Sequence, residues 1–185
     1  MATSDLCSAA DVQAFMGISG GQDVALIQSL VANASVFVLN YTNRIFLQQT
    51  YAETRNGHGG SSLPLREYPI TAVASMSIDG VAVQPATSAS GAGYVFDSSL
   101  VYLRGGQVFA RGVQNVSISY TAGYATVPLD MVQATIEIVA SKYKRRQDLH
   151  VSSKILDGQT IAFVVADLTP TAKLALQAYQ RVFMA

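Results

Sequence analysis

Hydrophobic and polar positions follow two different periods along this chain, and the change from one to the other divides the sequence. From Val116 to Tyr120 apolar residues alternate with serines, which is the period of a half-buried strand. Beyond Pro128 the apolar residues recur every three or four positions, the spacing of one helix face, at Val132, Ile136, Val139 and Tyr143. The pattern therefore predicts that a strand-rich middle is followed by a helix that begins near Pro128.

A short helix is predicted at the start of the chain. Ser8 and Asp11 have the spacing of a capping box, which would open a helix that runs through Met16. Gly17 supplies the left-handed residue that commonly ends a helix.

A second, longer helix is predicted from about Asp23 to Thr42, with Asp23 or Ser19 available as its N-cap. Its apolar positions form one stripe, made of Val24, Ile27, Val31, Ala34, Val38 and Tyr41. Further apolar residues widen this face: Leu26, Leu30 and Phe37. We expect such a helix to lie deep in a core or to be covered in part by a neighbouring subunit. Because polar residues interrupt it, we interpret it as a core helix and not as a membrane span.

The middle of the chain, from Phe46 to about Tyr124, is predicted to form short strands separated by turns. Asn56-Gly57 and Asp79-Gly80 are strong hairpin signals, because both residues of such a turn must tolerate positive φ. Another hairpin is predicted within the segment YVFDSSLVYLRGG, and the segment VQNVSISYTAGY is expected to close the sheet.

The segment from Asp148 to Asp167 lies between two predicted helices and is itself prone to form strands. Ile161 to Val165 reads as a strand, and a hairpin around Asp157-Gly158 would be only marginally stable alone. We expect this segment to pair with the main sheet or with another chain. A final helix begins after the cap Thr169-Pro170.

Together these elements predict an α+β fold. A small α-helical bundle is expected from residues 1–48 and 127–185, with an extended segment at 148–167. The intervening residues 49–126 are expected to form an inserted antiparallel β-rich segment, either sandwich-like or barrel-like.

Composition narrows the class of protein. Half of the 185 residues are hydrophobic and 13% are charged, so a disordered chain is excluded. The 12 basic and 12 acidic residues give a formal net charge of zero, which argues against a protein dedicated to nucleic-acid binding. The N-terminus lacks a basic region followed by an apolar core, so we expect no signal peptide.

No constellation of residues in the sequence nominates a catalytic or metal site. Cys7 is the only cysteine, and the two histidines, His58 and His150, are far apart in the sequence. His58 lies in a glycine-rich turn without the lysine and context of a phosphate-binding loop. We therefore expect no catalytic residue, no metal and no cofactor.

The one cluster of like charge lies at the C-terminal end of the predicted third helix, in KYKRR. Cations at a helix C-terminus are favoured by the macrodipole, by about 0.3–1 kcal/mol each, so the cluster has a sufficient structural reason. A binding role remains open, and an acidic protein surface fits the neutral net charge better than DNA does.

Several motifs resemble phage head–tail connector proteins, also called adaptor or head-completion proteins. Near the N-terminus these are Asp11-Val12, Phe15-Met16, Ile18, Asp23 and Asn43-Arg44-Ile45-Phe46. Further along they are YPITAVASMSIDG, VYLRGG, VSISYTAGYATVPLDM, YKRR and VSSKILDGQTIAF, so the resemblance covers nearly the full chain. Met16 and Asn43 depart from the family pattern, which commonly has leucine and glycine there.

The resemblance implies a structural virion protein that catalyses nothing. Such connectors dock as a dodecameric ring under the portal, extend the DNA channel and provide the platform for the stopper or tail. The implied partners are the portal protein, a stopper or tail-completion protein, other copies of the chain, and packaged DNA that passes without sequence preference; no membrane is implied. The protein would be found at the head–tail junction of the virion, and in the host cytoplasm during assembly.

Candidate contact residues for the portal or a neighbouring subunit follow from this model. They lie in the basic cluster and in the strand-prone segment after it: Lys142, Lys144, Arg145, Arg146, Ser152, Ser153, Lys154, Ile161, Phe163 and Val165. Two other functions stay open at this point. One is another ring-forming head- or tail-completion protein, such as a stopper, and the other is a small cytosolic hydrolase built on His58 or His150.

Overall fold

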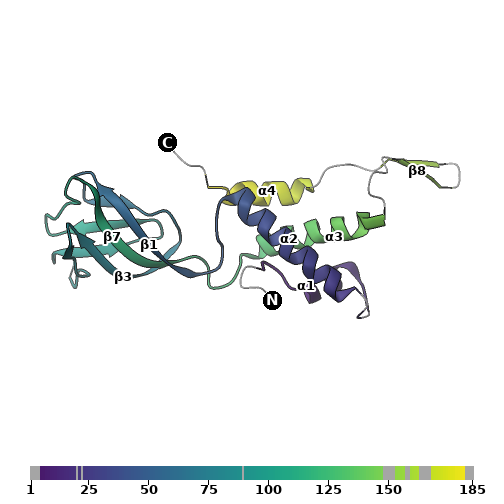
Figure 1. The fold of residues 1–185 in the computed structure, drawn as a ribbon, viewed down its shortest axis with the longest axis horizontal. Helices are drawn as coiled ribbons and strands as arrows, with labels where there is room; N and C mark the ends of the chain where they lie inside the picture. The colour runs from purple at the N-terminus through teal and green to yellow at the C-terminus, as the bar shows by residue number, and fades with distance from the viewer. Residues whose placement is uncertain are drawn as a thin grey trace. The chain divides into compact units, whose positions relative to one another are not determined.

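The computed structural model describes residues 5–19, 21, 23–88, 90–147, 153–156, 159–162 and 168–181 (Figure 1). The chain divides into two compact units. We call Met1–Ile45 with Val127–Ala185 the helical unit and Phe46–Thr126 the β unit. The elements of the two units make up the predicted α+β fold.

Four α-helices make up the helical unit: α1 (Ala9–Met16), α2 (Val24–Thr42), α3 (Leu129–Lys144) and α4 (Pro170–Tyr179). A short 3-10 turn, η1 (Arg145–Gln147), continues α3. α3 is the central helix, because α1, α2 and α4 all pack against it. Accordingly α3 is buried over most of its circumference, at Met131, Ala134, Thr135, Ile136, Ile138, Val139, Ala140 and Tyr143.

The ends of α1 are formed as the sequence predicts. Ser8 and Asp11 make the reciprocal capping box, and the hydrogen bonds from Ser8 lower the pKa of the Asp11 carboxyl. Gly17 ends the helix in the left-handed conformation, with φ 66°. These bonds satisfy backbone groups that the helix itself leaves unpaired.

The apolar stripe predicted on α2 is the side that packs in the bundle. Its centre is buried at Ile27, Val31, Ala34 and Val38. By length and composition alone α2 could cross a membrane, since its mean hydropathy is 1.5, and 28% of the apolar window is buried in the helical unit. We interpret α2 as a bundle helix that has a packed side and an exposed side on which the apolar residues Leu26 and Val36 lie.

Seven strands make up the β unit: β1 (Gln49–Gly57), β2 (Ser62–Pro64), β3 (Ile70–Ile78), β4 (Val81–Ala82), β5 (Gly93–Phe96), β6 (Leu100–Arg104) and β7 (Gly112–Ala122). Two antiparallel sheets result, with strand orders β1-β7-β3-β4 and β2-β6-β5. Both sheets contribute to one apolar core, which includes Leu63, Met76, Tyr94, Val101, Phe109, Val116, Ile118 and Tyr120. This arrangement is sandwich-like and is not a closed barrel.

One of the two predicted hairpin turns is confirmed and the other is wrong. Asp79 and Gly80 both have positive φ, 51° and 80°, and join β3 to β4. Asn56 and Gly57 instead end β1, where the register with β7 shifts and Gly57 pairs with Gly112. A side chain could not replace the hydrogen of Gly57, because its Cβ would lie 1.8 Å from the carbonyl oxygen of Ala110.

The position of β7 also differs from the prediction. The sequence suggests that this segment closes the sheet, whereas β7 lies inside it, paired with β1 on one side and β3 on the other. Its alternation agrees with that place, because Val116, Ile118 and Tyr120 face the core. The chain enters and leaves the β unit through adjacent segments: Leu47 bridges Tyr124, and the Tyr124 N–H donates to the Phe46 carbonyl at 2.8 Å.

The strand-prone segment after η1 forms a hairpin of its own. β8 (Ser153–Leu156) pairs antiparallel with β9 (Gln159–Ala162) as a separate two-stranded sheet. The expectation that this segment joins the main sheet is therefore wrong for the described residues. The predicted strand at 161–165 is observed only as far as Ala162, and Phe163 and Val165 lie outside the described residues.

Candidate assembly interface

The basic cluster at the end of α3 is partly used within the chain. Arg146 lies 3.4 Å from the Asp23 carboxylate, and its guanidinium stacks 3.8 Å from the centre of the Tyr143 ring. Tyr143 donates a hydrogen bond from its hydroxyl to the same carboxylate. Asp23 occupies the N-cap position of α2, as predicted, but its side chain makes no capping bond and joins this cluster instead. The start of α2 is thereby tied to the end of α3.

Lys142 also faces α2. Its Nζ lies 5.6 Å from the centre of the Phe37 ring, and Phe37 in turn lies 6.1 Å from the Tyr41 ring. Two of the four cations of the basic cluster, Lys142 and Arg146, thus have partners in the helical unit. Their contacts support the structural interpretation of the cluster for these two residues.

Lys144 and Arg145 are placed differently. Lys144 is exposed and Arg145 is half-buried, and neither makes an ion pair with any residue that the structure describes. If the basic cluster binds a partner, these are the two charges that remain available for it.

The other candidate contact residues follow the basic cluster in the sequence. Ser153 and Lys154 lie in β8 and Ile161 lies in β9. Ser152, Phe163 and Val165 lie outside the described residues. The structure therefore supports a hairpin at this place, and the assignment of its residues as contacts stays a prediction.

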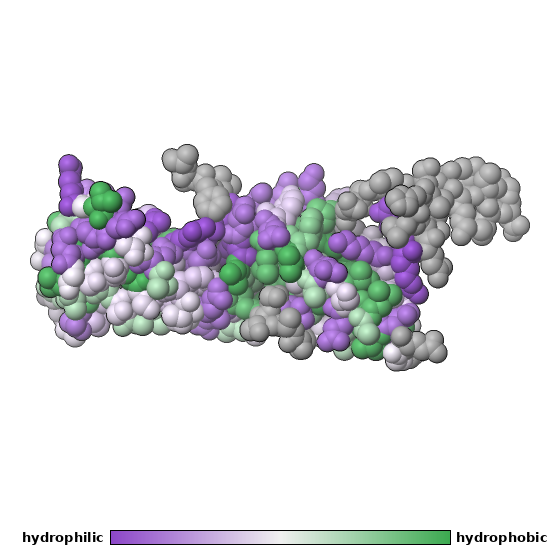
Figure 2. Space-filling model, viewed as in Figure 1, coloured by the Kyte–Doolittle hydropathy of each residue, from purple (hydrophilic) through white to green (hydrophobic). Residues whose placement is uncertain are grey.

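Large apolar side chains are exposed on the helical unit. Leu26 and Val36 on α2 are 41% and 50% exposed, and Phe15 on α1 is 51% exposed. Ile45, Leu129 and Leu174 are exposed as well, and apolar surface is visible over the helices in Figure 2. Soluble monomers rarely leave large contiguous apolar patches uncovered, so such patches mark contact sites. Of the residues that widen the predicted α2 stripe, Leu26 belongs to this exposed set. The others are not predicted from the sequence, and these are Phe15, Val36, Ile45, Leu129 and Leu174.

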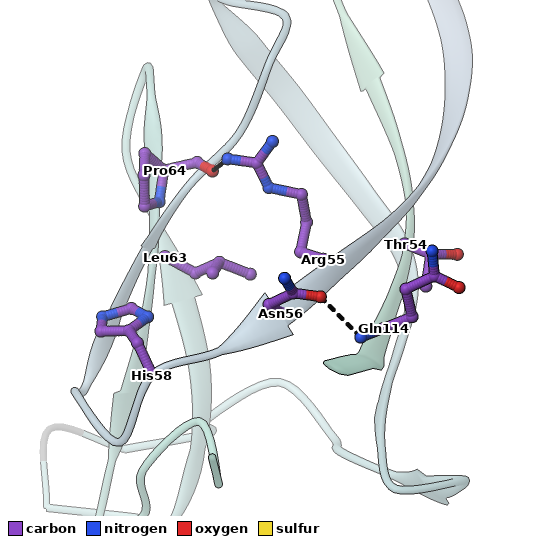
Figure 3. A pocket seen from close by; sticks show the side chains of 7 residues that line it. All are labelled: Thr54, Arg55, Asn56, His58, Leu63, Pro64 and Gln114. Carbon is purple, nitrogen blue, oxygen red and sulfur yellow. Dashed lines mark hydrogen bonds between the residues drawn. The ribbon is translucent and has the colours of Figure 1, made fainter. Parts of the chain in front are cut away.

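His58 lies beside a cavity of about 580 Å³ in the β unit, which offers no catalytic arrangement. The cavity is lined by Thr54, Arg55, Asn56, His58, Leu63, Pro64 and Gln114 (Figure 3). None of these residues is a carboxylate that could pair with the imidazole as a base. Among the described residues no group of three His, Cys, Asp or Glu side chains could hold a metal ion. His150, the other residue considered for a hydrolase, lies outside the described residues.

Cys7 has the environment of a core residue. It is buried, and burial raises the pKa of its thiol to about 12, with Asp11 and Asp5 adding to the effect. The reactive thiolate is therefore scarce at neutral pH.

Solved structures with the same fold come from particles of the gene transfer agent (GTA). One similar chain is from the neck of an empty GTA particle with C6 symmetry, with 18% sequence identity and a TM-score of 0.59. A second is from the virion of the native particle, with 14% identity and a TM-score of 0.61. A third is from the neck of the native particle with C12 symmetry, with 15% identity and a TM-score of 0.59. Each comparison covers 100% of this chain and 94% of the other.

No curated protein matches the chain. The family model for head completion protein, in contrast, matches residues 5–182, which is nearly the whole length. The match confirms the resemblance that the sequence motifs indicate. The chain therefore belongs to the head completion protein family, and it is a structural phage protein and not an enzyme.

Proposed function

We propose that the protein is the adaptor of the head–tail junction. It docks as a ring under the portal, extends the DNA channel and provides the platform for the stopper or tail. The observation that carries this proposal is the exposure of Leu26 and Val36 on α2, in a chain of the head completion family. A ring built from one kind of chain needs two different surfaces on each copy, and this side of α2 can supply one of them.

The comparisons support the same function. Two similar chains belong to necks of GTA particles, whose structures were computed with C6 and with C12 symmetry, and a dodecameric ring of this protein is compatible with both. The location that follows is the head–tail junction of the virion, with the host cytoplasm as the place of assembly. Packaged DNA passes through the lumen, and the formal net charge of zero suits weak, sequence-independent contact.

A direct test is to mix the purified protein with purified portal and to image the product by electron microscopy. We expect a ring of this protein on one end of the portal. A portal that stays bare at high protein concentration would contradict the proposed docking. Binding only to a preassembled ring of another neck protein would instead favour the role of a stopper.

The basic cluster divides into two pairs that should respond differently to alanine. Lys144→Ala with Arg145→Ala removes the two cations without ion pairs, so we expect portal affinity to fall roughly 5- to 30-fold, from about 1–2 kcal/mol of lost attraction. The loss should shrink at high salt, because exposed charges are screened. Sedimentation of the portal complex at two salt concentrations measures both effects.

Lys142→Ala with Arg146→Ala is the matched control, since it removes the same charge from the same helix end. These side chains contact Phe37, Tyr143 and Asp23, so we expect about 1–2 kcal/mol lower stability of the helical unit. Portal affinity should change little. Equal loss of affinity in both double variants would show that the cluster acts only through its total charge.

A further inference from the structure

The two edges of the four-stranded sheet are protected to very different degrees. At one edge β4 has only two residues, Val81–Ala82, and Pro85 follows three positions later. Short edge strands and prolines are common ways to prevent further strand pairing. At the other edge β1 runs for nine residues, Gln49–Gly57, and pairs with β7 on its inner side only.

The outward-facing side chains of β1 carry no charge that would oppose the addition of another strand. Thr50, Ala52 and Thr54 are exposed on the outward face and carry no charge. Its two charged residues lie on the other face, where each is engaged. Glu53 accepts a hydrogen bond from the Arg66 N–H at 3.2 Å, and Arg55 donates to the Pro64 carbonyl at 3.2 Å. Among the described residues no strand pairs with the outer side of β1, and its outward-facing side chains carry no charge, so this edge is a template for another strand.

Space is available beside this edge. The cavity of about 580 Å³ lies where β1, at Thr54 and Arg55, faces β2, at Leu63 and Pro64 (Figure 3). Side-chain bonds, such as that of Arg55 to Pro64, cross from β1 to β2, but the two strands share no ladder. The edges of the two sheets thus stay apart, and the chain's own described residues do not pair with the outer side of β1.

The same chain carries an incomplete sheet. β8 and β9 pair with each other and with no other described strand. A two-stranded hairpin is marginally stable in water and becomes stable when a third strand is added. The described residues therefore include a long open edge, at β1, and a hairpin that lacks a third strand.

We infer that within the ring the β8–β9 hairpin of one copy pairs with the β1 edge of the next copy. This inference rests on the proposed ring and names the contact that joins its subunits. A second copy is the fitting occupant because a donor and an acceptor on one chain form a head-to-tail contact. Such a contact repeats around a ring until every hairpin and every β1 edge is used. Main-chain hydrogen bonds supply the attraction, as in other cases of strand addition.

Engineered cysteines test this pairing. Ala52→Cys is combined, one at a time, with a cysteine at each position of β8 and β9, from Ser153 to Leu156 and from Gln159 to Ala162. Rings are assembled on purified portal, oxidised mildly and run on a denaturing gel without reductant. Cys7 does not interfere, because it is buried and its thiol is held protonated. We expect at least one position to give a ladder of covalent dimers, trimers and larger species.

Ser75→Cys, combined with the same hairpin cysteines, is the matched control. Ser75 lies in the same cross-strand row as Ala52, since both pair with Ser119, but it is on β3. A strand added beside β1 would lie about 5 Å from Ala52 and about 14 Å from Ser75. A disulfide needs Cα atoms within about 7 Å, so the control should give no ladder.

The outcomes separate the inference from the function on which it rests. Rings that form normally but give no ladder at any of the eight positions would overturn the strand addition alone. Disulfides to portal subunits, or disulfides within a single chain, would show that the β1 edge does not pair with a second copy. Failure to form any ring on the portal would overturn the proposed function as well.

Discussion

Val38→Asp is expected to unfold the helical unit, whereas Val36→Asp, two positions away on the same helix, should leave it folded. Val38 is 0% exposed and faces the bundle, while Val36 is 50% exposed. A carboxylate at position 38 would be buried without a partner, which costs roughly 4 kcal/mol or more, a large part of the about 5–15 kcal/mol that stabilises a typical domain. Thermal unfolding followed by circular dichroism at 222 nm, where helices dominate, would show the difference.

The pair also separates folding from assembly. Val36→Asp adds a charge to the exposed apolar side of α2, so rings on the portal should be lost although the monomer melts near the wild-type temperature. A Val36→Asp protein that assembles as well as the wild type would show that this side of α2 lies outside the interface. A Val38→Asp protein that keeps its helical signal would contradict the packing of α2 described above.

Tyr120→Phe is expected to destabilise the β unit by about 1.5–3 kcal/mol. Tyr120 is completely buried, its hydroxyl donates to the Glu53 carboxylate, and it accepts from the Glu67 N–H at 3.1 Å. Phenylalanine fills the same space but leaves both partners without this bond. Denaturation by urea, followed by the strand signal near 218 nm, measures the loss. A Tyr94→Phe variant is the control, because the Tyr94 hydroxyl makes one long hydrogen bond among the described residues, to the Val73 carbonyl at 3.3 Å.

The same tyrosine should make the β unit sensitive to alkali. Burial, and then the hydrogen bond to Glu53, raise the pKa of Tyr120 above the value of about 10 expected in the unfolded chain. Above pH 10 the folded state therefore holds a proton that the unfolded state releases. The free energy of unfolding should then fall as the pH rises, by up to about 1.4 kcal/mol per pH unit.

Tyr120→Phe lacks this proton, so its stability should fall less steeply above pH 10 than that of the wild type. Tyr102 is the other described tyrosine with a raised pKa, because it donates to Asp97, but it is present in both proteins. The contribution of Tyr102 therefore cancels when the pH dependence of stability of the variant is subtracted from that of the wild type. Parallel curves for wild type and variant would show that Tyr120 ionises equally easily in the folded and unfolded states.

The elements that the sequence predicts well are those determined by local interactions. The capping box of Ser8 and Asp11 and the turn at Asp79-Gly80 each involve residues within four positions of one another, and both are confirmed. The turn predicted at Asn56-Gly57 fails for the opposite reason. Asn115, 58 residues from Gly57, accepts its N–H at 2.8 Å and holds the segment as the end of a strand. Nothing near Asn56 in the sequence reveals that partner.

The candidate interface likewise combines features that the sequence predicts with contacts between residues that are distant in the sequence. The cations at the end of α3 are visible in the sequence, but Arg146 meets Asp23, 123 residues earlier. Only the tertiary structure therefore separates the two cations with partners from Lys144 and Arg145. The sequence also indicates a hairpin around Asp157-Gly158, and β8 and β9 do pair with each other, but the expectation that this segment joins the main sheet is wrong for the described residues. The exposure of Phe15 depends on which face of α1 meets the bundle, which its short periodic pattern does not determine.

The paired segments at the base of the β unit have a consequence for how such proteins can diversify. Because Phe46 and Tyr124 are hydrogen-bonded neighbours, the chain departs from the helices and returns to them at nearly one point. A module joined in this manner behaves as a cassette, since exchanging it replaces the whole sandwich without breaking any helix of the bundle. Recombination at two short junctions could thus exchange the β unit while the helices are inherited unchanged, provided that the incoming unit keeps an open edge strand for the hairpin of the next copy.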